Sequence, residues 1–365
     1  MPIPLFDPEP ALAPLRADVQ ARVSEVIERG RFILGPEVDA FERELAVYLG
    51  ARHVIGVANG TDAITIALRS LDVKPGDEVV VPSFTFYATA EAVVTAGAKP
   101  VFCDVDQATR NVTKDTVRAA LTTRTKAVVV VDLFGCPAPV PEISELGLPV
   151  LEDAAQAAGA TLGGRCAGTL GDVATLSFYP SKNLGAFGDG GAIVTSNEAI
   201  AERARTLRFH GSRDKRTFSE VGYNSRLDEL QAAILRVLLP HLKGWSQGRR
   251  AVGAAYADAG LDAHVSLPEA PAGAEPAWHL FVACHPRADE VIGALAELGV
   301  ESRAYYRTPV HRQPAMRAYP RAAAELTATD ELAHTNLALP MSPTLGREQV
   351  AEVVAAVERA VAGLQ

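Results

Sequence analysis

The stretch T-L-S-F-Y-P-S-K-N-L-G-A-F-G-D-G-G-A-I-V at residues 175–194, together with L-E-D-A-A-Q at 151–156, decides the fold expected for this chain. Two apolar runs, 173–179 and 191–195, flank a glycine-rich loop that is too short to hold a crossover helix. We therefore expect the two runs to pair antiparallel, with Lys182 in the connection between them. A lysine held in such a loop, downstream of an acid at a strand end, is what a Schiff-base cofactor site requires.

Upstream of this hairpin, short apolar runs alternate with helix-length segments. Strands of a parallel sheet are covered by helices on both faces, so their sequences are apolar throughout rather than alternating. The runs of this kind are 53–58, 77–82, 100–105, 126–132 and 149–153. We predict an α/β fold in which a mostly parallel central sheet is flanked by helices.

The remainder of the chain predicts an N-terminal arm and a second, smaller domain. Helices are expected over 15–28, from Asn197, from Ser225, over 289–299 and over 347–361, with a strand at 278–284 and an ordered arm at 32–38. Pro240 is a plausible break. We assign residues 1–240 to the arm and a large cofactor-binding domain, and residues 241–365 to a small C-terminal α+β domain.

Composition excludes several classes of function. The formal net charge is −9, from 35 basic and 44 acidic residues, and no basic stripe suits a nucleic-acid backbone. The four cysteines are scattered singly, which favours reduced thiols and predicts no metal site. No basic leader followed by an apolar run and no stretch of about 18 apolar residues is present, so we expect a cytoplasmic protein without membrane partners.

Two strand ends carry groups suited to ligand binding. A-N-G-T-D-A-I at 58–64 places Gly60 and Thr61 where a strand passes into a helix, which suits a phosphate or serves as an ordinary helix cap. Glu152 and Asp153 close another strand, and alternation directs only one of them into a site at this edge. That acid could pair with a protonated ring nitrogen, or both could be solvated.

The surroundings of Lys182 distinguish it from a surface lysine. Few polar residues lie near it in the sequence, Ser177 is on the preceding strand, and the glycines of the loop allow unusual backbone conformations. These glycines do not form a G-x-G-x-x-G pattern, so no dinucleotide site is predicted. Phe86, in P-S-F-T-F-Y-A-T, follows a strand end and could stack on a flat ring or belong to the core.

Taken together, these segments resemble the fold-type-I pyridoxal-phosphate enzymes, and most closely the sugar aminotransferase family called DegT/DnrJ/EryC1/StrS. The resemblance runs almost end to end and in one order. The matching segments are 32–42, 58–63, 76–86, 151–159, 177–192 and 222–235.

The resemblance implies a role for each matching residue. Lys182 and Asp153 would be catalytic, with Lys182 in the Schiff base and Asp153 on the pyridine nitrogen of pyridoxal 5'-phosphate. The other cofactor contacts would be Gly60, Thr61 and Ser177 at the phosphate, Phe86 on the ring, Gln156 at the ring hydroxyl, and Asn224 reaching the cofactor of a second subunit. Tyr306 and His311, in Y-Y-R-T-P-V-H at 305–311, would contact substrate. A homodimer with shared active sites follows.

The family implies a transaminase of deoxyamino-sugar biosynthesis. We expect transfer of an amino group from L-glutamate, through pyridoxamine 5'-phosphate, to a nucleotide-linked keto-deoxysugar, with C3 of a dTDP-3-keto-6-deoxyhexose as the first choice. The alternatives are a C4 aminotransferase, an enzyme for a UDP-linked ketouronate, and one for a keto-inositol. From another class, the alternative is a cofactor-binding regulator without turnover.

Overall fold

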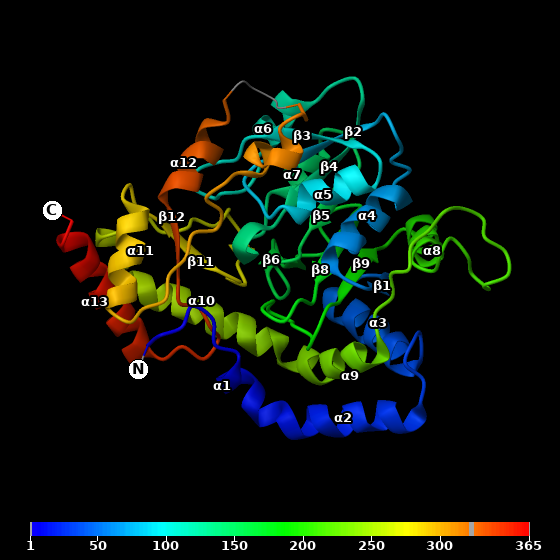
Figure 1. Cartoon of the computed structure of the whole chain (residues 1–365), viewed down its shortest axis with the longest axis horizontal. Helices are drawn as coiled ribbons and strands as arrows, with labels where there is room; N and C mark the ends of the chain where they lie inside the picture. Colours follow the sequence, from blue (N-terminus) through cyan, green and yellow to red (C-terminus); the bar gives the residue numbers. More distant parts are fainter. Residues whose placement is uncertain (1, 321–324, 365) are drawn as a thin grey trace.

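The computed structural model describes residues 2–320 and 325–364. Its centre is a seven-stranded sheet in the order β1-β9-β8-β5-β4-β2-β3 (Figure 1). The strands are β1 (His53–Val57), β2 (Glu78–Pro82), β3 (Lys99–Cys103), β4 (Thr125–Val131), β5 (Val150–Asp153), β8 (Val173–Ser177) and β9 (Gly191–Thr195). All run in one direction except β9, which pairs antiparallel with both β8 and β1.

Helices cover both faces of this sheet, as the apolar runs predict. Within β2, Val79 and Val81 pack with α4, α5 and α8, while Val80 packs on the opposite side with α6 and α7. On that opposite side α3 and α9 cover the end of the sheet near β8, β9 and β1. These helices are α3 (Pro36–Leu49), α4 (Gly60–Ser70), α5 (Ala88–Thr95), α6 (Lys114–Ala120), α7 (Val140–Ser144), α8 (Glu198–Leu207) and α9 (Glu229–Leu238).

The C-terminal part forms its own layer beside the large sheet (Figure 1). The two-stranded sheet of β11 (Phe281–Cys284) and β12 (Asn336–Leu339) packs with α10 (Leu242–Asp258), α11 (Ala288–Glu297) and α13 (Arg347–Ala362). Ile3, near the N-terminus, also belongs to this core, and its N–H donates to the Gly299 carbonyl at 2.8 Å. The remaining elements are α1 (Glu9–Leu12), α2 (Arg16–Arg29), α12 (Thr327–Thr335), β6 (Thr161–Leu162), β7 (Arg165–Cys166) and β10 (Ala274–Glu275).

Most of the predicted elements are present, with four differences in detail. The strand at 53–58 lies beside the antiparallel β9, so it has no parallel neighbour. The helix expected from Ser225 begins at Glu229, because Ser225 and Asp228 are held in extended contacts with Ala58 and Ile33. Residues 278–280 lie outside β11, and Pro36 already starts α3 within the predicted arm.

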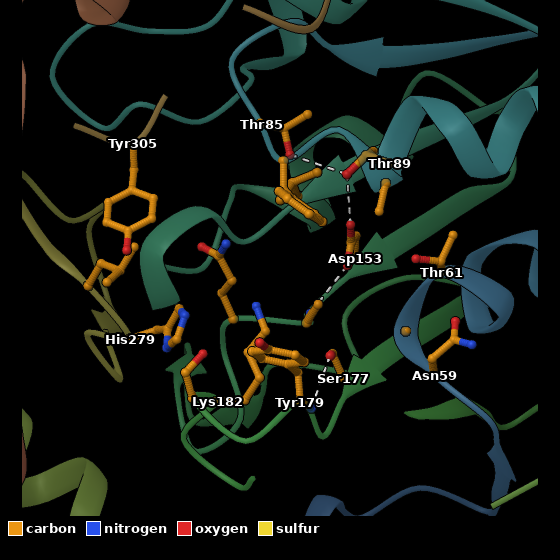
Figure 2. A pocket seen from close by; sticks show the side chains of 18 of the residues that line it. Asn59, Thr61, Thr85, Thr89, Asp153, Ser177, Tyr179, Lys182, His279 and Tyr305 are labelled. Carbon is orange, nitrogen blue, oxygen red and sulfur yellow. Dashed lines mark hydrogen bonds between the residues drawn. The ribbon is translucent and has the colours of Figure 1, made fainter. Parts of the chain in front are cut away.

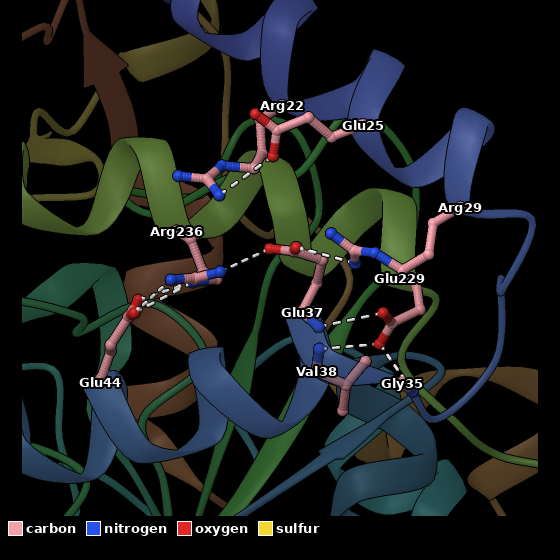
Figure 3. Close-up of polar contacts among 9 residues, drawn as sticks. All are labelled: Arg22, Glu25, Arg29, Gly35, Glu37, Val38, Glu44, Glu229 and Arg236. Atoms are coloured by element: carbon pink, nitrogen blue, oxygen red, sulfur yellow. Dashed lines mark hydrogen bonds and ion pairs between the residues drawn. The ribbon is translucent and has the colours of Figure 1, made fainter.

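Glu229 joins two segments that are far apart in the sequence (Figure 3). Its buried carboxylate accepts backbone N–H bonds from Gly35 (2.8 Å), Glu37 (3.0 Å) and Val38 (2.8 Å), which are at the N-terminus of α3. A carboxylate at this place satisfies free donors and meets the positive end of the helix dipole. A Cβ on Gly35 would lie 2.6 Å from Oε2 of Glu229, so this approach requires glycine.

The division at residue 240 stays a prediction, although the chain does bend there. A 3₁₀ turn, Leu239–His241, separates α9 from α10 and contains Pro240.

Among the described residues no helix is long and apolar enough to cross a membrane.

Candidate active site

A cavity of about 450 Å³ opens at the C-terminal edge of the parallel strands (Figure 2). Strand-end and post-strand segments line one side of it, namely those after β1, β2, β5 and β8. Parallel strands present their carboxyl ends at one edge of a sheet, which is where open α/β folds bind ligands. Residues of the C-terminal part, His279 and Tyr306 among them, close the opposite side.

Lys182 lies in the loop between β8 and β9, and its side chain lines the cavity. Burial lowers its pKa from 10.5 to about 8, while the charge of Asp153 acts in the opposite direction. The neighbouring Asn183 anchors the loop, because its Nδ2 donates to the Ala277 carbonyl at 2.9 Å. The lowered pKa therefore makes the neutral amine of Lys182 more accessible near neutral pH than that of a surface lysine, as a Schiff-base nucleophile requires.

Asp153, the last residue of β5, faces the cavity and is almost fully buried. Burial raises the pKa of its carboxyl, and the interactions that oppose that rise include a 3.0 Å hydrogen bond from the Thr89 hydroxyl, the N–H of Ala155 and the charge of Lys182. Thr85 extends this series of hydrogen bonds, with 3.2 Å between its Oγ1 and that of Thr89 (Figure 2). Asp153 is thus prepared to hold a negative charge against a cationic ligand.

Glu152 is the acid of the pair that points away from the cavity, and it is buried rather than solvated. Its buried carboxylate accepts N–H bonds from Gly168 (2.6 Å), Leu170 (2.7 Å) and Gly171 (3.3 Å), away from the cavity. It is also hydrogen-bonded to the buried side chain of Asp132, which follows β4. Two carboxyl groups can share such a bond only if one keeps its proton, and burial with the charge of Glu152 raises the pKa of Asp132 well above its ordinary value.

The N-terminus of α4 forms a phosphate-sized cradle. Asn59 caps this helix by accepting the Asp62 N–H at 2.8 Å, which leaves the first N–H groups, at Gly60 and Thr61, free of helical partners. The backbone is closely approached here: a Cβ on Gly60 would lie 2.9 Å from Cβ of Ser177. Free N–H groups, two hydroxyl residues and the helix dipole together suit a phosphate.

Aromatic and amide side chains complete the cavity. Gln156 accepts the Phe134 N–H through Oε1 at 2.6 Å and donates from Nε2 to the Tyr306 hydroxyl at 3.3 Å. Phe86 is 54% exposed, and its ring lies 5.9 Å from that of Tyr306. A flat ring between Phe86 and the strand edge would have Asp153 at one side and Gln156 at another.

The structure gathers most of the predicted site residues around this cavity. The predicted residues that line it are Gly60, Thr61, Phe86, Asp153, Gln156, Ser177, Lys182 and Tyr306. His311 is not among the lining residues: it is buried, and its Nδ1 faces the hydroxyl of Ser83, with the Phe102 ring nearby. Asn224 is exposed at the base of the loop that follows α8 and makes a hydrogen bond with Arg226, outside the cavity.

Sequence reasoning missed several lining residues, and three of them are Thr89, Tyr179 and His279. Thr89 comes three residues after Phe86, and Tyr179 comes two residues after Ser177, so both stand close to predicted site residues. His279 was read only as part of a strand. Its place beside the other site residues depends on the packing of the C-terminal part.

The residues present fit pyridoxal phosphate on the geometry alone. The absence of a side chain at Gly60 lets the start of α4 approach Ser177 closely, and the cavity is lined by both the Asp153 carboxyl and the Lys182 amine. The cavity volume is within the range of small-molecule sites.

Comparisons with known proteins agree with this arrangement. The sequence model of the DegT/DnrJ/EryC1/StrS aminotransferase family matches residues 14–358. A UDP-N-acetyl-3-dehydro-alpha-D-glucosamine 3-aminotransferase of Acidithiobacillus ferrooxidans is 44% identical over 99% of this chain and 98% of its own length. A dTDP-3-amino-3,4,6-trideoxy-alpha-D-glucose transaminase of Streptomyces venezuelae is 42% identical, over 97% of this chain and 95% of its own.

A solved structure is similar in both fold and sequence. It is that of DesV from S. venezuelae in complex with a ketimine intermediate, with a TM-score of 0.94 and 42% identity, covering 98% of each chain.

Proposed function

This chain belongs to the DegT/DnrJ/EryC1/StrS aminotransferase family and is a pyridoxal-phosphate-dependent sugar aminotransferase, and from that premise we propose its substrates, its site residues and its assembly. The amino donor is L-glutamate, and the acceptor is the C3 carbonyl of a nucleotide-linked 3-keto sugar. The observation that carries the site assignment is that the Lys182 amine, from the loop between β8 and β9, and the Asp153 carboxyl, at the end of β5, face the same cavity.

Pyridoxal phosphate supplies a carbonyl that accepts amines and a ring that withdraws electrons from the carbon next to the nitrogen. Asp153 holds the ring nitrogen in its protonated form, and the Thr89 hydroxyl keeps that carboxylate charged. The Gln156 side chain is held in place by its hydrogen bonds with the Phe134 N–H and the Tyr306 hydroxyl, and it orients the ring hydroxyl. Gly60, Thr61 and Ser177 hold the phosphate.

Lys182 has two uses in this mechanism. Its neutral amine would hold the cofactor through the carbonyl, and its Nζ would also be the group that moves a proton to and from the carbon of the amino donor. A pKa of about 8 suits this task, because the amine can both gain and lose a proton near neutral pH. Phe86 and Tyr306 form apolar walls on the side of the cavity next to this site.

C3 of a nucleotide-linked sugar is the position that two relatives share. Their names place the new amino group at C3, on a UDP sugar in one and on a dTDP sugar in the other. We propose dTDP-3-keto-6-deoxyhexose as the first substrate to test, with UDP-linked 3-keto sugars next. A C4 keto sugar and a UDP-linked ketouronate are the alternatives.

The experiment has two parts. The purified protein with its cofactor is mixed with L-glutamate, and the visible band of the bound cofactor is followed. A panel of 3-keto and 4-keto sugars on dTDP and UDP is then added, and the products are identified by NMR. We expect the band to bleach with glutamate and amination only at C3. Amination at C4 alone would contradict the proposed acceptor.

We also propose a homodimer in which Asn224 completes the partner's cofactor site. Asn224 is exposed, and the neighbouring loop presents Phe218 and Val221, which are 60% and 83% exposed, to solvent. Apolar side chains gathered beside a predicted site residue suit a subunit contact.

Mixed dimers test this arrangement. Lys182→Ala and Asn224→Asp are each expected to be inactive or weak alone. A heterodimer of the two contains one site with both native residues, so co-expression should restore up to half of the wild-type activity. No recovery in a purified heterodimer would contradict shared sites.

A regulator without turnover is the candidate from another class. It would also bind pyridoxal phosphate at Lys182, but its visible band would not respond to glutamate. The pKa of Lys182 near 8 favours turnover, because a purely structural lysine has no need of it.

A further inference from the structure

His279 is the buried polar side chain of the cavity for which the mechanism above has no use. Its ring lies beside Lys182 (Figure 2), and only 8% of its surface is exposed. Nδ1 is enclosed and has no hydrogen-bond partner among the described residues. A buried donor or acceptor without a partner is costly, so such a group in a binding cavity indicates a missing ligand.

The charges around His279 select the kind of ligand. Two positive groups act on the ring: Lys182, and the buried Arg249, whose guanidinium donates to backbone carbonyls. Burial and these two positive groups lower the pKa of His279 well below its usual value. Asp153 is at the far side of Lys182, and Asp189 is exposed at the rim. The environment of the imidazole therefore favours an anion.

The imidazole is also held in place relative to Lys182. Nη1 of Arg249 donates to the carbonyls of Trp278 (3.0 Å) and His279 (3.4 Å). On the other side, the Asn183 amide joins the lysine loop to Ala277. The two hydrogen-bonded anchors leave little freedom for the segment that carries His279.

We propose that His279 binds the α-carboxylate of the amino donor. This inference rests on the proposed transamination. The donor nitrogen must reach the position of Nζ of Lys182, and its α-carboxylate is attached one carbon away from that nitrogen. The second carboxylate of glutamate lies several bonds farther, and a keto sugar has no anion next to its carbonyl. The neutral imidazole accepts both substrates in turn, because it donates an N–H to the carboxylate without repelling a neutral sugar.

The two half-reactions provide the kinetic test. In His279→Ala we expect kcat/KM for L-glutamate to fall roughly 10- to 100-fold, the loss that accompanies one hydrogen bond to a charged group. The reaction of the aminated cofactor with the keto sugar should change less than about 3-fold. His279→Gln keeps an N–H donor and should recover part of the loss. His334→Gln, an exposed histidine on α12, is the matched control.

L-Glutamine distinguishes the two carboxylates, because it shares the α-carboxylate but has an amide at the other end. Equal fold losses with glutamate and glutamine support the proposal. Loss of the preference for glutamate over glutamine in His279→Ala would assign His279 to the side-chain carboxylate and overturn it, as would equal losses in both half-reactions.

Binding to the cofactor-free protein gives a readout independent of activity. With inorganic phosphate saturating the α4 cradle, 2-oxoglutarate is titrated while the imidazole ¹⁵N resonances are recorded. The His279 resonances should shift as its N–H forms the hydrogen bond to the carboxylate, and no other histidine should respond. Unmoved His279 resonances would overturn the proposal. A wild-type enzyme that is inactive with glutamate would instead contradict the proposed function, and the titration would still test His279.

Discussion

The Thr89 hydroxyl donates a 3.0 Å hydrogen bond to Oδ2 of Asp153, and Thr89 is the second residue of α5 while Asp153 ends β5. The bond therefore connects the acid of the cofactor site to a different segment of the large sheet. It also opposes the effect of burial, which would otherwise favour a neutral carboxyl.

Thr89→Val removes this bond while preserving the shape of the side chain. We expect kcat to fall roughly 10-fold, because Asp153 loses one hydrogen bond to its charged form and stabilises a protonated ring nitrogen less well. Steady-state kinetics with both substrates measure the effect. Thr95→Val, on the exposed face of the same helix, should behave as wild type. Equal rates for the two variants would show that the bond has no catalytic effect.

Lys182→Met should abolish turnover and stabilise the cofactor-free protein. The folded-state pKa of about 8 lies below the ordinary 10.5, so at pH 7 the folded protein carries a buried ammonium at a cost on the order of 1–3 kcal/mol. Between these two pKa values the folded state binds fewer protons than the unfolded state. The free energy of unfolding of the wild type therefore increases relative to that of the variant as the pH rises from about 8 to 10.5.

Urea unfolding of the cofactor-free proteins at pH 7 and pH 10 measures this difference. The advantage of Lys182→Met should be larger at pH 7 than at pH 10. Lys243→Met, at an exposed lysine, should show no such pH dependence. A constant difference between the variant and wild type would mean that the lysine is not strained by burial.

Asp132 and Glu152 should respond differently to amide substitution. Asp132→Asn keeps a donor for Glu152 and an acceptor for the Ala138 N–H, which lies 2.9 Å from Asp132 Oδ1. Glu152→Gln instead turns an NH₂ group toward the backbone donors of Gly168 or Leu170. We expect Asp132→Asn to fold normally and Glu152→Gln to lose about 1–3 kcal/mol of stability.

The pH dependence of stability tests which of the two groups holds the proton. A carboxyl with a raised pKa contributes stability that is present below its unfolded value and is lost as pH rises through its folded value. Asp132→Asn removes this loss, so its stability relative to wild type should increase between pH 5.5 and pH 8.5. Chemical denaturation of the wild type and the variant at pH 5.5 and pH 8.5 measures this change in relative stability. A relative stability that decreases over this range would place the proton elsewhere.

Glu229→Gln should weaken the attachment of α3. The amide accepts only through one oxygen, whereas the carboxylate accepts three N–H bonds at the helix N-terminus. We expect a loss of about 1–3 kcal/mol in the free energy of unfolding. Glu28→Gln, an exposed glutamate on α2, is the control. Thermal unfolding of the two variants side by side decides the point.

The strands and the hairpin around Lys182 could be predicted because they depend on local pattern. The run 126–132, for example, is apolar at every position from 127 to 131, which is typical of a parallel strand covered on both faces. The choice between Glu152 and Asp153 needed the structure, because both close the same strand and their partners at Gly168 and Thr89 belong to distant segments.

His279 could not be found from its own surroundings in the sequence. An isolated histidine in an apolar strand is usual for a buried core, and nothing near it indicates that Lys182, almost one hundred positions earlier, is its neighbour. The start of α9 was misplaced for a related reason. Ser225 and Asp228 suit a helical first turn locally, but contacts with Ala58 and Ile33 hold them extended.

The cavity has two walls of separate origin, one from the strand ends of the large sheet and one from residues 279–306 of the C-terminal part. Mutations in the second wall leave the cradle at Gly60 and the acid at Asp153 untouched, so a descendant of this chain can acquire a new sugar without first losing its cofactor. Divergence among such enzymes is in this sense modular, and exchange of the C-terminal wall between two relatives is a practical route to altered sugar preference.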